Sequence, residues 1–128
     1  MQGLTLSTTR KLFAAQLAAC RPIPESRNKY AYRGIDLTRA WVQGVVVAVE
    51  TRRLAVDDGT GVLWVTVDNI AGRFGLGAYV MVIGPPAGPG CLQAHQVMAL
   101  GVGREPVWFL EVLEYWALLT PQVIELLE

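Results

Sequence analysis

The sequence predicts a single, mainly β domain with a short helix near its N-terminus and a longer helix near its C-terminus. Its 128 residues are typical of one domain and are sufficient to bury a core without disulfides or metals. Between residues 40 and 100, short β-branched and apolar runs alternate with segments rich in glycine, proline and aspartate. Residues 105–119 instead repeat their apolar positions at helical spacing.

The chain before Ile35 is predicted to be mostly irregular, and β structure is predicted from Ile35 onward. Residues 1–10 are rich in serine and threonine, and we expect them to be flexible. From Lys11 to Cys20, apolar residues recur at helix-like intervals, which predicts a short helix or turn that Pro22 and Pro24 end. The segment 21–33 carries four basic residues and two tyrosines and is predicted to be a loop.

Five strands are predicted after this loop, at residues 40–50, 51–57, 62–67, 78–83 and 91–100. Gly44 interrupts the first strand, which predicts a bulge or a sharp bend there. Asp57-Asp58-Gly59-Thr60-Gly61 joins the second and third strands in a tight hairpin.

This order of elements is typical of the OB fold. Five strands with nearly continuous apolar runs cannot form a flat sheet with one solvent-exposed face, so we expect the sheet to curl and close around a buried interior. We therefore predict a five-stranded OB-fold barrel with a short N-terminal helix and a C-terminal helix, as one domain over residues 11–128. Another small barrel, or an α+β sheet with the helix on one face, are the alternatives.

The C-terminal helix at 105–119 is apolar around an unusually large part of its circumference. Glu105 and Pro106 suit its first turn. At about 100° per residue, two adjacent apolar stripes cover roughly 220°, whereas a helix on one core needs little more than about 100°. A further helical turn is predicted at 121–127, after Thr120-Pro121.

A helix of this kind is expected to be buried on two sides, first by its own domain and then by a partner. The residues predicted to bind the partner are Trp108, Phe109, Leu110, Val112, Leu113, Tyr115, Trp116 and Leu119. Phe109, Leu113 and Trp116 are the first to test, although periodicity leaves open which tryptophan faces outward. As alternatives, the N-terminal segment around Leu12, Phe13 and Leu17 covers the helix, or the helix pairs with a second copy.

The composition agrees with a covered apolar surface. Hydrophobic residues make up 52% of the chain and charged residues only 17%, against a typical quarter. No apolar run approaches the roughly 18 residues of a membrane span, and the first residues lack the features of a signal peptide. Cys20 and Cys91 lack metal-site spacing, so we interpret them as reduced, intracellular thiols, with a disulfide as the alternative.

Opposite charges gather in the two parts of the chain. Residues 1–53 hold nine bases and three acids, a net charge of +6, and residues 54–128 hold two bases and eight acids, a net charge of −6. Such asymmetry steers a partner or binds nucleic acid at the basic end, or else it marks two solvated faces of opposite sign.

No arrangement of residues predicts an enzyme, a cofactor or a metal. His95 is the only histidine, and Cys91 would lie roughly 13 Å away along an extended strand. Asp57 and Asp58 are explained as turn formers.

The serious rival function is a single-stranded nucleic-acid-binding OB module. Its candidate contacts are Arg52, Arg53 and Trp64, supplemented by Lys29, Tyr30 and Arg33. Nearby acids make this groove weakly basic, so we expect little or no direct DNA binding.

Four blocks of the chain are similar to those of a known family. They are Ala40-Trp41-Val42-Gln43-Gly44-Val45-Val46, Tyr79-Val80-Met81-Val82-Ile83-Gly84, Cys91-Leu92-Gln93-Ala94, and Trp108 with Leu110-Glu111-Val112. Their order and spacing resemble the small subunit of the RecQ-mediated genome instability complex.

The resemblance implies a single OB-fold subunit that pairs with the C-terminal OB domain of a larger partner subunit, as in the core of replication protein A. The pair joins a Bloom-type RecQ helicase and a type IA topoisomerase in the nuclear machine that dissolves double Holliday junctions. A peptide of a Fanconi anaemia translocase docks on the paired core in that family.

Overall fold

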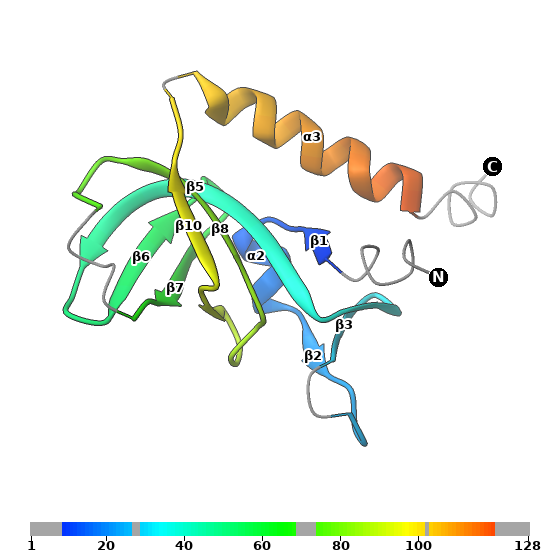
Figure 1. Cartoon of the computed structure of the whole chain (residues 1–128). Helices are drawn as coiled ribbons and strands as arrows, with labels where there is room; N and C mark the ends of the chain where they lie inside the picture. The colour runs from blue at the N-terminus through cyan, green and yellow to red at the C-terminus, as the bar shows by residue number, and fades with distance from the viewer. Residues whose placement is uncertain (1–8, 27–28, 69–73, 102, 120–128) are drawn as a thin grey trace.

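A computed structural model describes residues 9–26, 29–68, 74–101 and 103–119. Within these ranges the fold is mainly β with two helices, as the sequence predicts. Figure 1 shows the longer helix, α3 (Arg104–Leu119), lying along one side of a curved sheet. The predicted turn at 121–127 lies outside the described residues.

The larger sheet is built around β5, which pairs with β1, β6 and β8. Its order is β10-β8-β5-β6-β7-β9, with β1 beside β5 in parallel. The strands are β1 (Thr9–Lys11), β5 (Arg39–Val49), β6 (Arg53–Asp57), β7 (Val62–Thr66), β8 (Tyr79–Gly84), β9 (Cys91–Gln93) and β10 (Gln96–Ala99). All five predicted strands are present, and the last one is divided in two at Ala94 and His95.

The two ends of this order, β9 and β10, are consecutive in the chain. Between them, the amide of Ala94 donates to the carbonyl of Thr66 in β7, and the amide of His95 donates to that of Ile83 in β8. This segment therefore bridges β7 and β8, the strands next to the two ends of the sheet order. The strand order is nevertheless open and contains seven strands, so the predicted five-stranded barrel is not confirmed.

Gly44 lies where β5 and β6 approach each other closely. A Cβ atom there would stand 2.6 Å from the carbonyl oxygen of Asp57, so a larger residue would force the strands apart. The register of β5 shifts between Val46 and Ala48 instead. The predicted bulge therefore lies two residues further along the strand, and Gly44 itself permits the close approach of β5 and β6, a second role that glycine serves in strands.

Two strands of a small three-stranded sheet lie within residues 21–33, which the sequence predicts to be a loop. The sheet consists of β2 (Arg21–Pro22), β3 (Tyr30–Tyr32) and β4 (Ile35–Leu37), paired antiparallel in that order. Figure 1 shows β2 and β3 at the far end of the molecule from β6 and β7. The loop prediction is wrong because strands of two or three residues are too short to show alternation.

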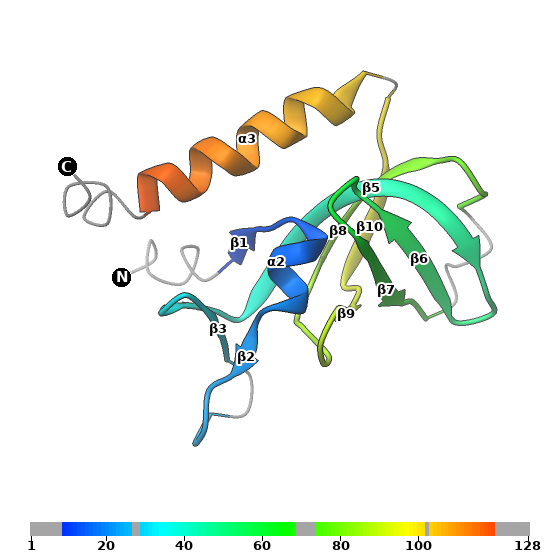
Figure 2. The same ribbon diagram turned by 180° about the vertical axis from the view of Figure 1, so that it is seen from behind.

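The N-terminal segment also begins its regular structure earlier than predicted. Thr9 and Arg10 belong to β1 and pair with Arg39 and Ala40, although both were placed in the flexible segment 1–10. The rest of that segment, residues 1–8, lies outside the described residues. Figure 2 shows β1 beneath α3.

The helix α2 (Ala14–Ala18) is short, and the β6–β7 hairpin holds its first turn. The Asp58 carboxylate accepts a hydrogen bond from the amide of Ala14 (2.6 Å), and Thr60 Oγ1 accepts one from that of Ala15 (3.1 Å). Gly59, with φ at 91°, closes the hairpin. The amides of the first helical turn have no acceptor within the helix, and two of them thereby gain acceptors from a segment that is distant in the chain.

Candidate protein interface on helix α3

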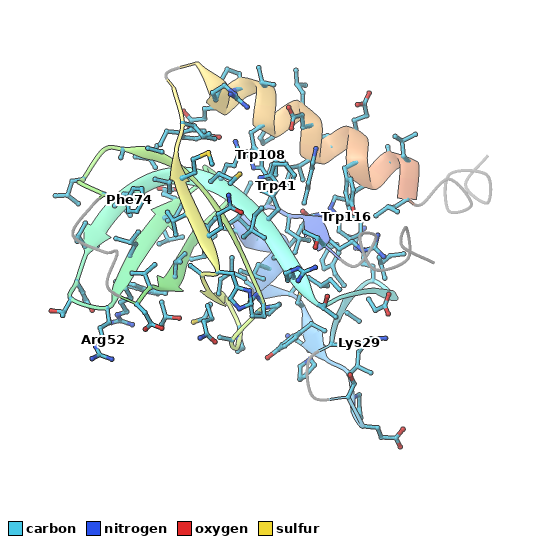
Figure 3. The ribbon with its side chains drawn as sticks, viewed as in Figure 1. Lys29, Trp41, Arg52, Phe74, Trp108 and Trp116 are labelled. Carbon is cyan, nitrogen blue, oxygen red and sulfur yellow. The ribbon has the colours of Figure 1, made fainter. Side chains whose placement is uncertain are left out.

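The inner face of α3 is fixed to the body by a stack of aromatic rings. Trp108 is 3% exposed, and its ring lies 5.7 Å from that of Trp41 in β5, nearly parallel to it. The ammonium of Lys11 lies 4.9 Å from the Trp41 ring centre and 3.4 Å from the Glu111 carboxylate. Figure 3 shows Trp41 and Trp108 together beneath the helix.

Trp116 anchors the other end of the same face. Its Nε1 donates to the carbonyl of Lys11 (2.6 Å), and its ring meets the ring of Tyr32 edge-on at 5.3 Å. The hydroxyl of Tyr115 donates to the carbonyl of Thr9 and accepts a hydrogen bond from Arg10. The C-terminal half of α3 is therefore held by β1 and by the small sheet.

Trp116 accordingly faces inward, and so does Trp108. The sequence grouped Trp116 with Phe109 and Leu113 as residues expected to face a partner, but it is only 9% exposed. On the helix it stands at the boundary between the two apolar stripes, where a hydrogen bond to β1 decides its direction. Val112 is fully buried on this inner face, and Tyr115 and Leu119 are partly buried.

The outer face of α3 carries a row of exposed apolar side chains. Phe109 is 46% exposed, Leu110 66% and Leu113 51%. Val107 and Leu118 are also exposed, so half of the ten exposed large hydrophobic residues in the described part of the chain belong to this helix. We call Phe109, Leu110 and Leu113 the outer strip. Their concentration on one element is typical of an interface.

Among the described residues, the N-terminal segment around Leu12, Phe13 and Leu17 leaves much of the outer strip exposed. Leu12 and Leu17, which were considered as a cover, are fully buried in the core beneath the helix. Phe13 contacts only the edge of the strip, with its ring 4.9 Å from that of Phe109. Within the described residues, the strip faces away from the body of the protein.

A cleft of about 360 Å³ adjoins the strip at the N-terminal end of α3. It is lined by Gln43, Asp58, Gly59, Tyr79, Glu105, Pro106, Trp108 and Phe109. Burial raises the pKa of the Tyr79 hydroxyl, and a hydrogen bond donated by Gln43 partly opposes this by lowering the pKa. The carboxylates of Glu105 and Asp58 raise the pKa further. Trp108 Nε1 is buried and has no hydrogen-bond partner in the described chain.

The predicted nucleic-acid contacts form two separate groups. Arg53 is bound to Glu50 (2.6 Å), and its guanidinium lies 3.9 Å from the ring centre of Trp64, so it covers the ring that a base would stack on. Arg52 is also exposed. Figure 3 shows Arg52 and Lys29 at opposite ends of the molecule.

The second group lies on the small sheet and is also engaged internally. Lys29 forms an ion pair with Asp36 (3.7 Å), and Arg33 lies over the ring of Tyr32. Tyr30 packs against the core. The structure therefore does not join the six residues into one basic aromatic groove.

The remaining chemical groups have structural roles. Asp57 accepts a hydrogen bond from Gly59 within the hairpin, and Asp58 binds Thr60 and Ala14. Among the described residues, no cluster of three or more histidine, cysteine, aspartate or glutamate side chains could hold a metal ion. Both cysteines are free thiols, and none of the described helices is long and apolar enough to span a membrane.

Sequence reasoning missed two residues that position the helix. Lys11 and Trp41 connect α3 to β1 and β5, yet neither was a candidate for the site. No local signal could have identified them, because their role arises only when β1 pairs with β5.

A family model described as RecQ-mediated genome instability protein 2 matches residues 8–116. A search of curated proteins finds no match. Among solved structures, the chain is similar to one in the crystal structure of the S. pombe Stn1–Ten1 complex, with a TM-score of 0.76 and 19% identity over 88% of this chain and 93% of that one.

Two further structures are of replication protein A bound to single-stranded DNA. The heterotrimer gives a TM-score of 0.68 with 20% identity, over 84% of this chain and 93% of that one. The yeast protein gives 0.64 with 20% identity, over 87% and 91%. At these identities the similarity shows an OB-like fold and nothing more.

Proposed function

The chain belongs to the RecQ-mediated genome instability protein 2 family, and from this premise we propose that it is a non-enzymatic OB-fold subunit that pairs through α3 with another OB domain. The partner in this proposal is the C-terminal OB domain of the large RecQ-mediated genome instability subunit. The pair stabilises a nuclear complex of a Bloom-type RecQ helicase and a type IA topoisomerase that dissolves double Holliday junctions. Docking of a Fanconi anaemia translocase peptide, and closure of the sheet as a barrel, belong to the same proposal.

The observation that carries this proposal is the outer strip. Its three side chains are 46–66% exposed, although the inner face of the same helix is anchored by two tryptophans. Burying a leucine or phenylalanine stabilises by about 1.5–3 kcal/mol, so covering three half-exposed side chains contributes about 2–5 kcal/mol. This is a substantial part of what an interface needs, and further contacts of the partner must offset the translational and rotational freedom lost on association.

Pairing is tested with a charge placed in the middle of the strip. We expect Leu113→Lys to weaken co-purification with the large subunit by at least about tenfold, because a buried lysine would lack a partner in an apolar interface. Since Leu113 is 51% exposed, thermal stability of the isolated chain should be nearly unchanged. The matched control is Met98→Lys on β10, where Met98 is 46% exposed. Retained pairing of the Leu113 variant, or equal loss in both, would contradict the proposal.

Single-strand binding is the second candidate, and the fold similarity to replication protein A supports it. The Glu50–Arg53–Trp64 contact must open before a base can stack on Trp64. We therefore expect binding of a labelled single strand to be weak at low salt and absent at about 0.15 M salt. Salt-resistant binding that Trp64→Ala abolishes would make this the primary function.

A further inference from the structure

The cleft at the N-terminal end of α3 is built by three separate parts of the fold. Helix α3, strands β5 and β8, and the β6–β7 hairpin each contribute side chains or backbone to its walls. Its volume of about 360 Å³ lies at the lower end of the range for ligand pockets, about 300–1,000 Å³. It therefore has room for a small ligand or for one residue of a peptide.

The indole of Trp108 brings an unused hydrogen-bond donor to this cleft. Trp108 is 3% exposed, and its Nε1 has no acceptor within the described chain. Figure 3 shows it beside Trp41, whose own Nε1 donates to Gln43 (3.1 Å). Gln43 in turn donates to the hydroxyl of Tyr79 (3.2 Å). Because a buried donor without an acceptor destabilises the fold, an acceptor that a ligand supplies to Trp108 is favoured.

Two carboxylates give the same cleft a negative charge. Glu105 is exposed and Asp58 is 8% exposed, and neither forms an ion pair within the described residues. Burial is the first cause of the raised pKa of Tyr79, but both carboxylates raise this pKa further, so their fields reach the hydroxyl inside the cleft. Arg104 acts in the opposite direction, so two acids and one base leave a net charge of −1 around this hydroxyl.

These two features together determine which chemical groups the cleft accepts. An anion would offer an acceptor to Trp108, but Glu105 and Asp58 would repel it. A neutral carbonyl offers the acceptor without this repulsion, and a cation a few bonds away is attracted to the acids. A lysine or arginine residue carries both groups, and its aliphatic stem can cover the apolar surface of Pro106 and Phe109.

We propose that this cleft binds a basic residue of an extended peptide segment, with its cation beside Glu105 and Asp58 and a backbone carbonyl as the acceptor for Trp108 Nε1. The segment is extended because the carbonyls of a helix are already used within the helix. This inference goes beyond pairing through the outer strip and does not depend on it, since Phe109 is the only residue that the strip shares with the described lining of the cleft.

The probes that test it are N-acetyl-lysine N′-methylamide and its norleucine counterpart, which has the same backbone and stem but no cation. Each is titrated into the full chain, with isotope-labelled tryptophan, at about 50 mM salt. The indole N–H resonance of Trp108 reports occupation of the cleft. The resonance of Trp64, which is not among the described lining residues, is the internal control.

We expect the lysine probe to shift the Trp108 resonance with a dissociation constant on the order of 1 mM, as is typical of a ligand of this size. The norleucine probe should bind about fivefold more weakly, because the attraction of the carboxylates for a cation is reduced by solvent at an open cleft. The difference between the probes should shrink as salt rises.

Two variants locate the cation. Glu105→Gln removes one carboxylate at an exposed position, so the chain should stay folded and the preference for lysine should fall to about twofold or less. Glu114→Gln is the matched control, because Glu114 is also an exposed acid of α3 but is not among the described lining residues. This control should keep the full preference.

The results that overturn the proposal are equally specific. Equal affinity of the two probes, or a preference that is undiminished in Glu105→Gln, shows that the cation does not lie beside these acids. An unshifted Trp108 resonance at about 20 mM of either probe, well above the expected dissociation constant, shows that the cleft does not bind such a residue. None of these measurements involves the large subunit, so their failure leaves the pairing proposal as it stands.

Discussion

At the scale of single residues, Trp108 and Trp116 decide which face of α3 is free. The two residues are eight positions apart on one side of the helix. The ring of Trp108 packs against Trp41, and the ring of Trp116 packs against Tyr32. The sequence established that α3 is apolar on two sides. It could not establish the direction of Trp116, because that direction depends on a carbonyl of β1, about a hundred residues away in the chain.

Replacing Trp116 should therefore damage the fold rather than the interface. We expect Trp116→Leu to lower the free energy of unfolding by about 2–4 kcal/mol, since it removes a buried ring and the bond to Lys11. Urea denaturation of the isolated chain measures this loss. Leu118→Ala is the control, with an expected change within about 0.5 kcal/mol because Leu118 is 74% exposed. Equal stability of the two variants would show that Trp116 is not an anchor.

The buried thiol of Cys20 makes the free energy of unfolding depend on pH in the alkaline range. Burial raises the pKa of its thiol from the ordinary 9.0 to about 11. An unfolded chain loses this proton near pH 9, whereas the folded chain keeps it to near pH 11. The stabilisation is therefore complete below about pH 9 and decreases by up to about 1.4 kcal/mol per pH unit as the pH rises toward 11.

This effect is isolated by comparing variants in urea at pH 8, 9 and 10. Cys20→Ala should show a smaller decrease across this range than the wild type. Cys91→Ala should decrease as the wild type does, because it keeps the buried thiol of Cys20. Parallel curves for the wild type and Cys20→Ala would refute the assignment.

At the scale of elements, the β6–β7 hairpin serves as the cap of α2. Phe13 at the N-cap has no side-chain hydrogen bond to offer the first turn, so Asp58 provides one from 44 residues away. The acids of this hairpin were explained from the sequence as turn formers. Their hydrogen bonds to Gly59 and Thr60 confirm that role, but the contact with α2 is tertiary and had no local signal.

Removing this cap should loosen α2 selectively. We expect Asp58→Ala to cost about 1–3 kcal/mol, because it leaves the amide of Ala14 buried without a partner. Amide hydrogen exchange should accelerate most at Ala14 and Ala15. Asp57→Ala removes only an exposed bond within the turn and should cost less than about 1 kcal/mol. Unchanged exchange at Ala14 in the Asp58 variant would contradict the capping role.

The predictability of each element follows from its length and composition. The five long strands were identified because runs such as Val45–Val49 and Tyr79–Ile83 are β-branched and apolar over several residues. β2 and β3 are missed because they are two or three residues long, and β1 because it lies in a polar segment and pairs in parallel with β5. Of the predicted partner-binding residues, Phe109, Leu110 and Leu113 lie on the outer face, whereas Trp108, Val112 and Trp116 belong to the core.

At the scale of the whole molecule, the opposite charges of the two chain parts are used partly for internal attachment. The basic N-terminal segment meets the acidic C-terminal helix, where Lys11 binds Glu111 and Arg10 binds Tyr115. The charge asymmetry of the sequence thus serves, at these contacts, to attach α3 to the N-terminal segment.

The most direct test of the pairing function is the mass of the chain in solution, alone and mixed with the C-terminal OB domain of the large subunit. Sedimentation equilibrium at micromolar concentration should show a monomer of 14.0 kDa for the chain alone. The equimolar mixture should show a one-to-one complex whose mass is the sum of the two chains. Two separate monomers in the mixture, or a homodimer of this chain that persists in it, would contradict the pairing of α3 with a second OB domain.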